Sequence, residues 1–312
     1  MLNWAIAGPG RMAAAMAADF PRVTNGEMLA VGSRSIDRAA AFAAEHGIDR
    51  AYGSYAELIA DPDVDALYIA TPHAQHAELA LAAIEARKAV LVEKAFTTSV
   101  AETSRVIEAA RAAGVFAMEA MWTRFNPGIV EARRLVESGE IGELRAMQGD
   151  LIAYRAFDAS DRLFAADLGG GAVLDLGVYV LSLAQYFMGT PTVVHAHGGT
   201  YSTGVEGEFG ALVGYPDGRT ATLAAAFTAR GPGRMMLVGT DGWIDLHPRF
   251  HRGPALTLWR GSESETLRFD SGYHYQVIHA GECIDAGLTE SPVMPLSDTQ
   301  EVQQLMAEVL NQ

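Results

Sequence analysis

The first part of the chain, up to about residue 120, alternates short apolar runs with alanine-rich segments of helical spacing. The helical segments span residues 35–46, 74–87 and 99–113. The apolar runs that they separate are Trp4–Ala7, Met28–Gly32, Ala66–Ala70, Ala89–Val92 and Val115–Met118. Buried runs separated by helices of about 10 to 15 residues are typical of βαβ units. We therefore predict a doubly wound, parallel α/β domain over residues 1–120.

After about residue 140 the apolar pattern changes to an alternation with a period of two, which predicts β-strands. The Asp-Gly pairs in YPDGRTAT and GTDGWIDL are strong hairpin signals, and ALTLWR and ETLRF are expected to form a third hairpin around GSES. One helix is expected at about residues 172–188, and two more close the chain. The last is expected to begin at residues 297–300, where Ser297 and Gln300 have the spacing of a capping box. Residues 121–312 are thus predicted to form an α+β domain with a largely antiparallel open sheet.

Composition and charge narrow the class of protein. The 312 residues are 49% hydrophobic and 20% charged, which is typical of a globular protein. The formal net charge is -15 and no run of basic residues occurs, which argues against a nucleic-acid partner.

Cysteine usage and the N-terminus bear on location. The single cysteine, Cys283, cannot form an internal disulfide, which suggests a reducing compartment. The N-terminal MLNWAIAGPG lacks the features of a signal peptide. Since no charge-free apolar stretch of about 20 residues occurs, we expect no transmembrane helix and no membrane partner. A cytoplasmic protein is therefore expected.

The stretch GPGRMA, residues 8–13, follows the first predicted strand and opens a helix. Gly8 would allow a tight turn, and Gly10 would let the main chain approach a pyrophosphate at the helix N-terminus. Strand, turn, helix and second strand follow one another within about 30 residues, which is the context that this fingerprint requires. We predict a dinucleotide site here, with Gly8, Gly10, Arg11 and Met12 among the residues that contact the cofactor.

The end of the second predicted strand distinguishes NAD from NADP. NAD sites carry an acidic residue there, whereas NADP sites have a basic residue near the 2'-phosphate. This chain has Ser33 and Arg34 at that place, and its first carboxylate, Asp37, is expected in the next helix. NADP is therefore favoured over NAD, with the alternative that Arg34 is a solvated loop residue.

Polar residues follow three consecutive strands of the predicted sheet. Lys94, one of only two lysines among 23 basic residues, comes directly after Ala89–Val92. The lysine ammonium is a compact charge whose pKa can be shifted, unlike that of arginine. Because ligands bind at the carboxyl ends of strands in an open parallel sheet, we expect Lys94 to face the nicotinamide. The cofactor-binding candidates at these strand ends are Thr71, Pro72, His73, His76, Glu93 and Lys94.

Six motifs together point to a family. In this order, GPGRMA, IATPHAQH, VEKAFT, EAMWTRFNP, GGGAVLDLGVY and ESPVMPL resemble the Gfo/Idh/MocA oxidoreductases, in particular the branch with dimeric dihydrodiol dehydrogenase and NADP-dependent D-xylose dehydrogenase. The resemblance extends over essentially the whole chain. It implies an N-terminal Rossmann domain, a C-terminal sheet used in dimerisation, an essential lysine in a Glu-Lys-Pro motif and an acid/base in a D-x-G-x-H/Y motif. These positions correspond to Lys94, Asp175 and Tyr179.

The chemistry that the resemblance implies is hydride transfer from a carbinol. Tyr179 would remove the hydroxyl proton, and Lys94 would be the cation that lowers the tyrosine pKa from its ordinary value near ~10. Asp175, four residues before Tyr179, would orient the lysine or the substrate. Without the resemblance, a tyrosine in this apolar helix would be interpreted as a core residue. Ala95 stands where the family has proline, so the main chain at Lys94 lacks a fixed φ, which puts the level of activity in question.

Further polar and aromatic residues allow more than one role. His73 and His76, and His195 and His197, lack acidic or thiolate partners at ligand spacing, so we expect no metal site. Three residues could either line the substrate pocket or pack at a domain junction: Trp122, Arg124 and Phe125.

We therefore expect an NADP-dependent dehydrogenase that acts on an aldose or related cyclic polyol and forms a homodimer or a higher homo-oligomer. One alternative is an NAD-dependent inositol or amino-sugar dehydrogenase of the same family. The other is a catalytically silent NADP-binding sensor, which the alanine at position 95 keeps open. Fold analogy does not transfer the substrate.

Overall fold

The computed structural model describes residues 1–311 and divides them into two compact units. The first unit comprises Met1–Trp122 and Gly272–Gln300. The second comprises Thr123–Ser271 and the residues from Glu301 onward.

The segment Gly272–Gln300 lies outside the domain to which the sequence-based boundary assigned it, residues 121–312. Its helix α8 (His274–Asp285) is bonded to the first unit, since Nδ1 of His274 lies 2.8 Å from Oδ2 of Asp19. This contact joins residues 255 positions apart. Local patterns of polar and apolar residues carry no signal of such a long-range pairing, which is why the sequence did not predict it.

A six-stranded, wholly parallel sheet forms the centre of the first unit, in the order β3-β2-β1-β4-β5-β6. Its strands are β1 (Leu2–Ala7), β2 (Gly26–Gly32), β3 (Arg50–Tyr52), β4 (Ala66–Ile69), β5 (Ala89–Glu93) and β6 (Ala117–Ala120). The strand order reverses between β1 and β4, and cofactors bind outside the carboxyl ends of the strands at such a point. The predicted doubly wound parallel fold is confirmed. The sequence did not predict β3, because three residues are too few for a periodic pattern.

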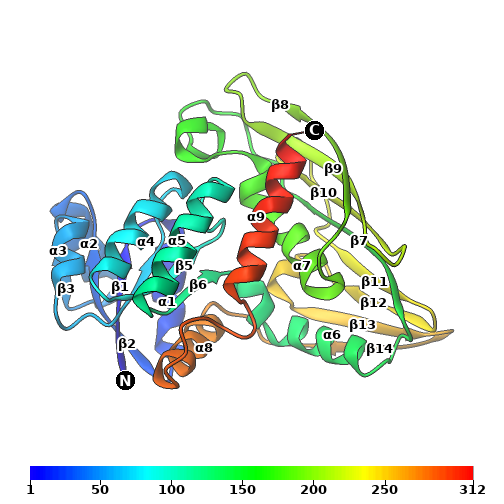
Figure 1. Cartoon of the computed structure of the whole chain (residues 1–312), viewed down its shortest axis with the longest axis horizontal. Coiled ribbons are helices and arrows are strands. Elements are labelled where there is room, and N and C mark those ends of the chain that lie inside the picture. Colours follow the sequence, from blue (N-terminus) through cyan, green and yellow to red (C-terminus); the bar gives the residue numbers. More distant parts are fainter. Residues whose placement is uncertain (312) are drawn as a thin grey trace. The chain divides into compact units, whose positions relative to one another are not determined.

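Helices connect the strands of the first unit. They are α1 (Arg11–Asp19), α2 (Ile36–His46), α3 (Tyr55–Ala60), α4 (His76–Glu85) and α5 (Val100–Ala113). Serines cap three of them: Ser35, Ser54 and Ser99 accept hydrogen bonds from the main-chain N–H three residues on. Helices α4 and α5 lie side by side (Figure 1).

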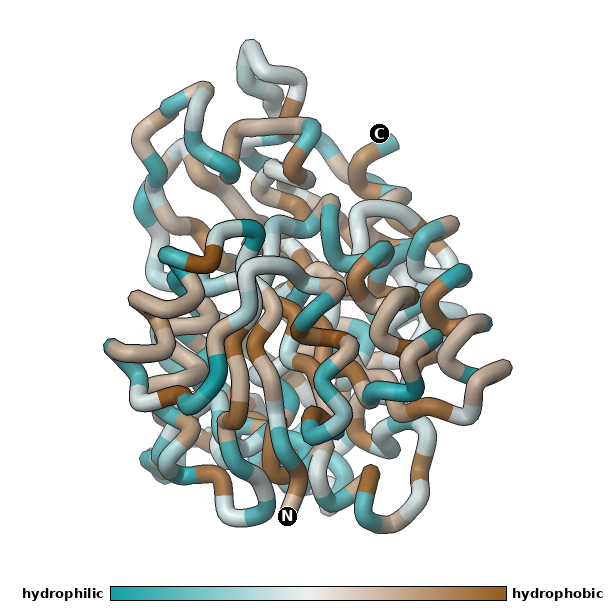
Figure 2. Tube along the Cα trace, turned by 90° about the vertical axis from the view of Figure 1, so that its left-hand side faces the viewer, coloured by the Kyte–Doolittle hydropathy of each residue, from teal (hydrophilic) through white to brown (hydrophobic). Residues whose placement is uncertain are grey.

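The core of the first unit is built from the strands and the apolar stripes of the helices around them. Figure 2 shows hydrophobic segments along the strands in the middle of this unit. Alanines are common where a helix packs closely on the sheet, as at Ala80 and Ala83 of α4, which are buried against Val90 and Val92 of β5 in one cluster. Small side chains let the helix axis approach the sheet. This close packing holds the strand ends at fixed positions.

The second unit contains an eight-stranded sheet in the order β14-β13-β12-β11-β7-β10-β9-β8. Its strands are β7 (Leu144–Ile152), β8 (Val193–Thr200), β9 (Glu206–Gly214), β10 (Thr220–Ala226), β11 (Met235–Gly239), β12 (Gly242–Leu246), β13 (Ala255–Arg260) and β14 (Glu263–Arg268). Only β7 and β10 pair in parallel. The prediction of a largely antiparallel sheet is confirmed, and all three predicted hairpins are present, as β9-β10, β11-β12 and β13-β14.

Helices α6 (Pro127–Glu137) and α7 (Val178–Met188) pack on one face of this sheet (Figure 1). A π-helical turn, Val173–Gly177, runs directly into α7, so the predicted helix at 172–188 has two parts of different winding. The stretch Ala166–Met188 is apolar and long enough to cross a membrane, but 94% of its most apolar window is buried inside the protein, as in a core helix. The other face of the sheet carries the alternate residues of each strand, among them the exposed Leu212 of β9 and the half-buried Trp243 of β12.

The last helix, α9 (Leu296–Leu310), does not begin as predicted. We expected Ser297 to cap it, but the helix already includes Ser297. The carbonyl of Pro295 accepts the N–H of Asp298 at 3.0 Å, and the Glu290 carboxylate accepts the N–H of Leu296 at 2.9 Å. A side chain six residues upstream therefore takes the role that the capping-box spacing assigned to the serine.

Candidate active site

The turn between β1 and α1 has the shape of a phosphate-binding turn. Gly8 has φ of 97°, and a Cβ at this position would lie 2.8 Å from Cγ2 of Thr71, so only glycine fits there. A Cβ on Gly10 would meet only the carbonyl oxygen of Ala70, at 3.8 Å, which leaves the outer side of the turn open. Gly10 is the N-cap of α1 and provides no side-chain hydrogen bond, so the N–H groups of the first turn of α1 point outward with no side-chain cap.

Thr71, the second residue after β4, supports the same interpretation. Thr71 Oγ1 is buried and has no hydrogen-bond partner within the described residues 1–311. A buried hydroxyl is normally hydrogen-bonded, so an unsatisfied one beside a glycine turn fits a bound polar group. The residues present therefore fit a dinucleotide, with Gly8, Gly10, Arg11, Met12 and Thr71 around its phosphates. Their role as ligands stays a prediction.

Two arginines lie near the end of β2. Arg34, which the sequence singled out, is exposed, and so is Arg38 in the first turn of α2. Both are close enough to Tyr55 for their charges to oppose the effect of burial, which raises the pKa of that phenol. Ser33 is buried, and its Oγ accepts the N–H of Ser35 at 3.3 Å, which fixes the turn that carries Arg34. Sequence reasoning missed Arg38, although its spacing of four from Arg34 was visible.

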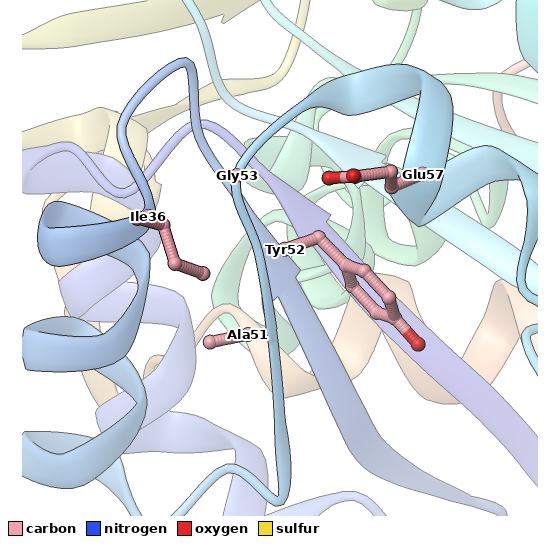
Figure 3. Close-up of a pocket in the computed structure, with 5 residues that line it drawn as sticks. All are labelled: Ile36, Ala51, Tyr52, Gly53 and Glu57. Atoms are coloured by element: carbon pink, nitrogen blue, oxygen red, sulfur yellow. The ribbon is translucent and has the colours of Figure 1, made fainter.

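A pocket of about 410 Å³ opens beside this turn, at the carboxyl end of β3 (Figure 3). Ile36 of α2, Glu57 of α3 and the chain from Ala51 to Gly53 line it. In dinucleotide-binding folds the adenosine ribose is recognised at the end of the second strand. The pocket is therefore in the right part of the first unit to accept the outer portion of such a cofactor.

The loop after β5, which carries Lys94, is held by two histidines from the preceding strand end. Nε2 of His73 lies 3.1 Å from the carbonyl oxygen of Lys94, and Nδ1 of His76 lies 2.9 Å from the carbonyl oxygen of Ala95. The other ring nitrogen of His76, Nε2, lies 2.9 Å from the carbonyl oxygen of Thr71. The peptide bond between Lys94 and Ala95 is cis. The histidines that we predicted as cofactor contacts thus bind the main chain of this loop.

Two buried carboxylates also hold this loop. Oε2 of Glu93 accepts the N–H of Lys94 at 3.2 Å, and Oε1 of Glu119, at the end of β6, accepts the N–H of Phe96 at 3.1 Å. The hydroxyl of Tyr68 donates to Oε1 of Glu93. Side chains from β5, β6, α4 and the turn before α4 therefore fix consecutive peptide groups around Lys94, and Tyr68 of β4 holds the Glu93 carboxylate. Sequence reasoning missed Tyr68, whose place inside a buried strand gave no sign of a polar partner.

His76 is wholly buried, and its electrostatics follow from that. Burial lowers its pKa, while the hydrogen bonds to the Thr71 and Ala95 carbonyls and a main-chain contact at Phe96 act in the opposite direction. The charge of Lys94 lowers the pKa further. A neutral imidazole has one N–H donor, so it can donate to only one of its two carbonyl partners at a time.

In the second unit, Asp175 and Tyr179 lie on either side of the junction between the π-helical turn and α7. Turns of this kind occur frequently at functional sites. Nη2 of Arg162 lies 3.8 Å from Oδ1 of Asp175, a long ion pair between a partly exposed guanidinium and a nearly buried carboxylate. The ring centroid of Tyr179 lies 5.1 Å from that of His251. Arg162 and His251 are therefore neighbours of the predicted catalytic residues that the sequence did not indicate.

The three candidate substrate contacts lie in or next to a short 3-10 turn, Trp122–Phe125. The Trp122 ring packs on the ring of Tyr273 in the first unit, with centroids 4.4 Å apart. Arg124 is completely buried in the second unit, where it donates to Oγ of Ser182 at 3.2 Å and to Oε1 of Gln185 at 2.7 Å. These contacts give both side chains structural partners. The substrate roles of Trp122, Arg124 and Phe125 stay predictions.

The comparisons with known families cover both units. Residues 2–121 match a family described as an oxidoreductase family with an NAD-binding Rossmann fold. Residues 129–245 match the Gfo/Idh/MocA C-terminal domain.

Individual proteins are similar over the full length. The chain is 33% identical over 331 residues to trans-1,2-dihydrobenzene-1,2-diol dehydrogenase of Mus musculus, covering 100% of this chain and 95% of the relative. It is 32% identical over 325 residues to the Xenopus laevis enzyme of the same name, covering 99% and 97%. Among solved structures, the aldose-aldose oxidoreductase of Caulobacter crescentus complexed with glycerol superposes with a TM-score of 0.91 at 26% identity, covering 99% of this chain and 96% of that one.

Proposed function

The chain belongs to the Gfo/Idh/MocA oxidoreductases, and we propose that it is an NADP-dependent dehydrogenase acting on a carbinol of an aldose, a diol or a related cyclic polyol. Relatives in the comparisons are named for a dihydrobenzenediol and for aldoses, which supports a small substrate with adjacent hydroxyl groups. The observation that carries the proposal is the set of side chains that fix the main chain around Lys94. A loop held at consecutive peptide groups defines where its lysine side chain begins.

The proposed division of roles follows the residues of each unit. The first unit binds the cofactor through the turn at Gly8 and Gly10 and the arginines that follow β2. The nicotinamide, when bound, accepts or donates the hydride. Tyr179 takes the hydroxyl proton of the substrate, Lys94 favours the phenolate by its positive charge, and Asp175 orients the substrate or the lysine. The proposal requires residues of both units to act on one substrate.

The acid/base roles are tested by steady-state oxidation of a panel of aldoses and diols, followed by absorbance of the reduced cofactor. Lys94→Met and Tyr179→Phe should each lower kcat by about 10²- to 10⁴-fold, the usual contribution of general acid-base catalysis. Loss of the lysine charge should also move the ascending limb of the pH profile to higher pH, because the phenol then keeps its proton to higher pH. Wild-type rates for both variants would reject the mechanism. Tight cofactor binding by the wild type with no turnover on any substrate would instead support the silent sensor.

The preference for NADP is proposed from Arg34 and Arg38, which give two guanidinium groups where an NAD site has an acidic residue. Arg34→Ala and Arg38→Ala should each raise the KM for NADP by about 10- to 100-fold, since a hydrogen bond to a charged group contributes roughly 1.5–3 kcal/mol. The KM for NAD should change little. Arg105→Ala, an exposed arginine of α5 paired with Glu78, serves as the matched control. Equal effects on both cofactors would contradict a contact to the 2'-phosphate, and a lower dissociation constant for NAD than for NADP would favour the NAD-dependent alternative.

We also propose that the protein is a cytoplasmic homodimer or higher homo-oligomer that uses the open face of the eight-stranded sheet. On this face Trp243 of β12 and Trp259 of β13 are paired and stacked, with ring centroids 5.2 Å apart. Leu212 of β9 is 46% exposed. Light scattering should give a mass of at least two chains, and Leu212→Glu should lower it. A monomer at micromolar concentration would contradict the proposal.

A further inference from the structure

Glu206, the first residue of β9, reaches the start of the helix that carries the proposed acid/base pair. Its Oε1 accepts the main-chain N–H of Val173 at 2.8 Å, and Val173 is the first residue of the π-helical turn. The two residues are 33 positions apart, so the contact ties the sheet to the helix. Asp175 lies two residues further along this turn, and Tyr179 lies in the first turn of α7.

The chain before this turn is shaped to admit the carboxylate. Gly171 has φ of 113°, and a Cβ at this position would lie 2.1 Å from Oε1 and 2.7 Å from Oε2 of Glu206. Any side chain at Gly171 would therefore displace the carboxylate from the helix start. The main-chain N–H of Asp175 donates to the carbonyl of Gly171 at 3.2 Å, so Gly171 also forms part of the first turn.

The helix start supplies a reason for an acceptor at this position. No side chain caps the π-helical turn at its own N-cap, Ala172. The first N–H groups of a helix need acceptors, and a carboxylate there is also favoured by the helix dipole. Burial raises the pKa of Glu206, while the N–H groups of Glu206 itself and of Val173 act in the opposite direction. Its carbonyl-type oxygen can accept the Val173 N–H in either protonation state.

We propose that Glu206 is a positioning residue, which sets the placement of Asp175 and Tyr179 by anchoring the first turn of their helix. This inference rests on the proposed catalytic roles of these two residues. Glu206 acts through the Val173 main chain and does not itself contact the reacting groups. A displacement of about 1 Å in a catalytic group can cost as much as 10²-fold in rate, so a loosened helix start is expected to lower kcat.

The test compares three replacements of Glu206 with a control that removes a contact to the same helix. Glu206→Ala removes the acceptor, Glu206→Asp keeps the charge but shortens the reach, and Glu206→Gln keeps both the reach and an acceptor oxygen. The control, Tyr215→Phe, removes a hydroxyl that donates to the carbonyl of Ala184 at 3.4 Å, beyond the first turn of α7. Each variant is measured for kcat, for the KM of NADP and for thermal stability.

The alanine and aspartate variants should lose roughly 10- to 100-fold in kcat with an unchanged KM for NADP, because the cofactor contacts lie in the other unit. The glutamine variant should stay within about threefold of wild type, since it retains the acceptor. Tyr215→Phe should lower the melting temperature without lowering kcat. If the alanine variant does not fold, the difference in kcat between the aspartate and glutamine variants still tests whether the acceptor at position 206 matters.

Two results would overturn the inference. One is a wild-type kcat in the alanine or aspartate variant, whatever its melting temperature. The other is a glutamine variant as slow as the aspartate variant, since the charge and not the acceptor would then matter. Failure of the proposed function is a different result, in which Tyr179→Phe is as active as wild type. An inactive Tyr179→Phe together with a fully active Glu206→Ala would reject the positioning role alone.

Discussion

Replacements of His76 can distinguish the contributions of the two carbonyl contacts that its ring makes. His76→Leu keeps an apolar side chain of similar size but removes both ring nitrogens. The carbonyls of Thr71 and Ala95, each 2.9 Å from one of these nitrogens, then lose a partner. Because a neutral imidazole donates only once, the loss corresponds to about one buried hydrogen bond, which costs roughly 1–3 kcal/mol when its acceptor stays unsatisfied. For a domain of this size that corresponds to a fall in Tm of about 2 to 12 °C.

The effect on activity should depend on which carbonyl keeps its donor. An asparagine amide nitrogen occupies a position close to Nδ1, next to Ala95, whereas a glutamine amide nitrogen reaches the position of Nε2, next to Thr71. We expect His76→Leu and His76→Gln to lower kcat by about 10-fold or more, because the loop around Lys94 is released. His76→Asn should retain most of the activity. Steady-state kinetics and circular dichroism melts of the three variants measure both effects.

The control is His46→Leu, in the last turn of α2. Its ring packs on Phe42 with centroids 4.3 Å apart, and its Nε2 has no hydrogen-bond partner within residues 1–311. This replacement should leave kcat unchanged. Equal kcat values for the leucine, glutamine and asparagine variants of His76 would refute the idea that the Ala95 carbonyl contact positions Lys94.

Three further predictions concern stability. Burial lowers the pKa of His76, so the unfolded chain binds a proton at this residue more readily than the folded protein does. The wild type should therefore lose stability as pH falls below about 6.5. The difference in urea midpoint between wild type and His76→Leu should shrink in the same range. Lys88→Met removes an ammonium that donates to the carbonyls of Asp61 and Val64 and should cost about 1.5–3 kcal/mol, visible as a lower Tm; an unchanged Tm would contradict this. Burial would raise the pKa of Asp19, but the hydrogen bonds from His274 outweigh burial and lower the pKa. Asp19→Asn should therefore destabilise the protein at pH 7, and this effect should disappear below about pH 4 in urea titrations.

The sequence predicts those features that depend on neighbours along the chain. The parallel fold follows from runs such as Ala89–Val92 between helices of regular length, and the glycine turn follows from its place between a strand and a helix. The hairpins follow from Asp-Gly pairs, as at Asp217 and Asp241. In each of these cases one short stretch contains the whole signal.

The remaining features depend on contacts between distant parts of the chain. The sequence of the π-helical turn Val173–Gly177 does not distinguish it from an α-helix, and the acceptor of its first N–H is Glu206, which comes from β9. The start of α9 is displaced because Glu290 accepts the N–H that a local cap would otherwise satisfy. The pairing of α8 with the first unit depends on Asp19 and His274, at opposite ends of the sequence. No local pattern encodes such partners.

The two lysines of the chain differ in the part of the residue that the fold holds. The ammonium of Lys88 donates to the carbonyls of Asp61 and Val64 at 2.9 and 2.6 Å, a convergence on two oxygens that a compact three-donor group satisfies better than a planar guanidinium. For Lys88, one of the two lysines in this arginine-rich chain, these hydrogen bonds are a purely structural explanation. The case for Lys94 as a catalytic residue has to come from its surroundings. There, side chains from three strand ends fix the main chain on both sides of its Cα, so that the point from which its ammonium extends is set before any substrate binds.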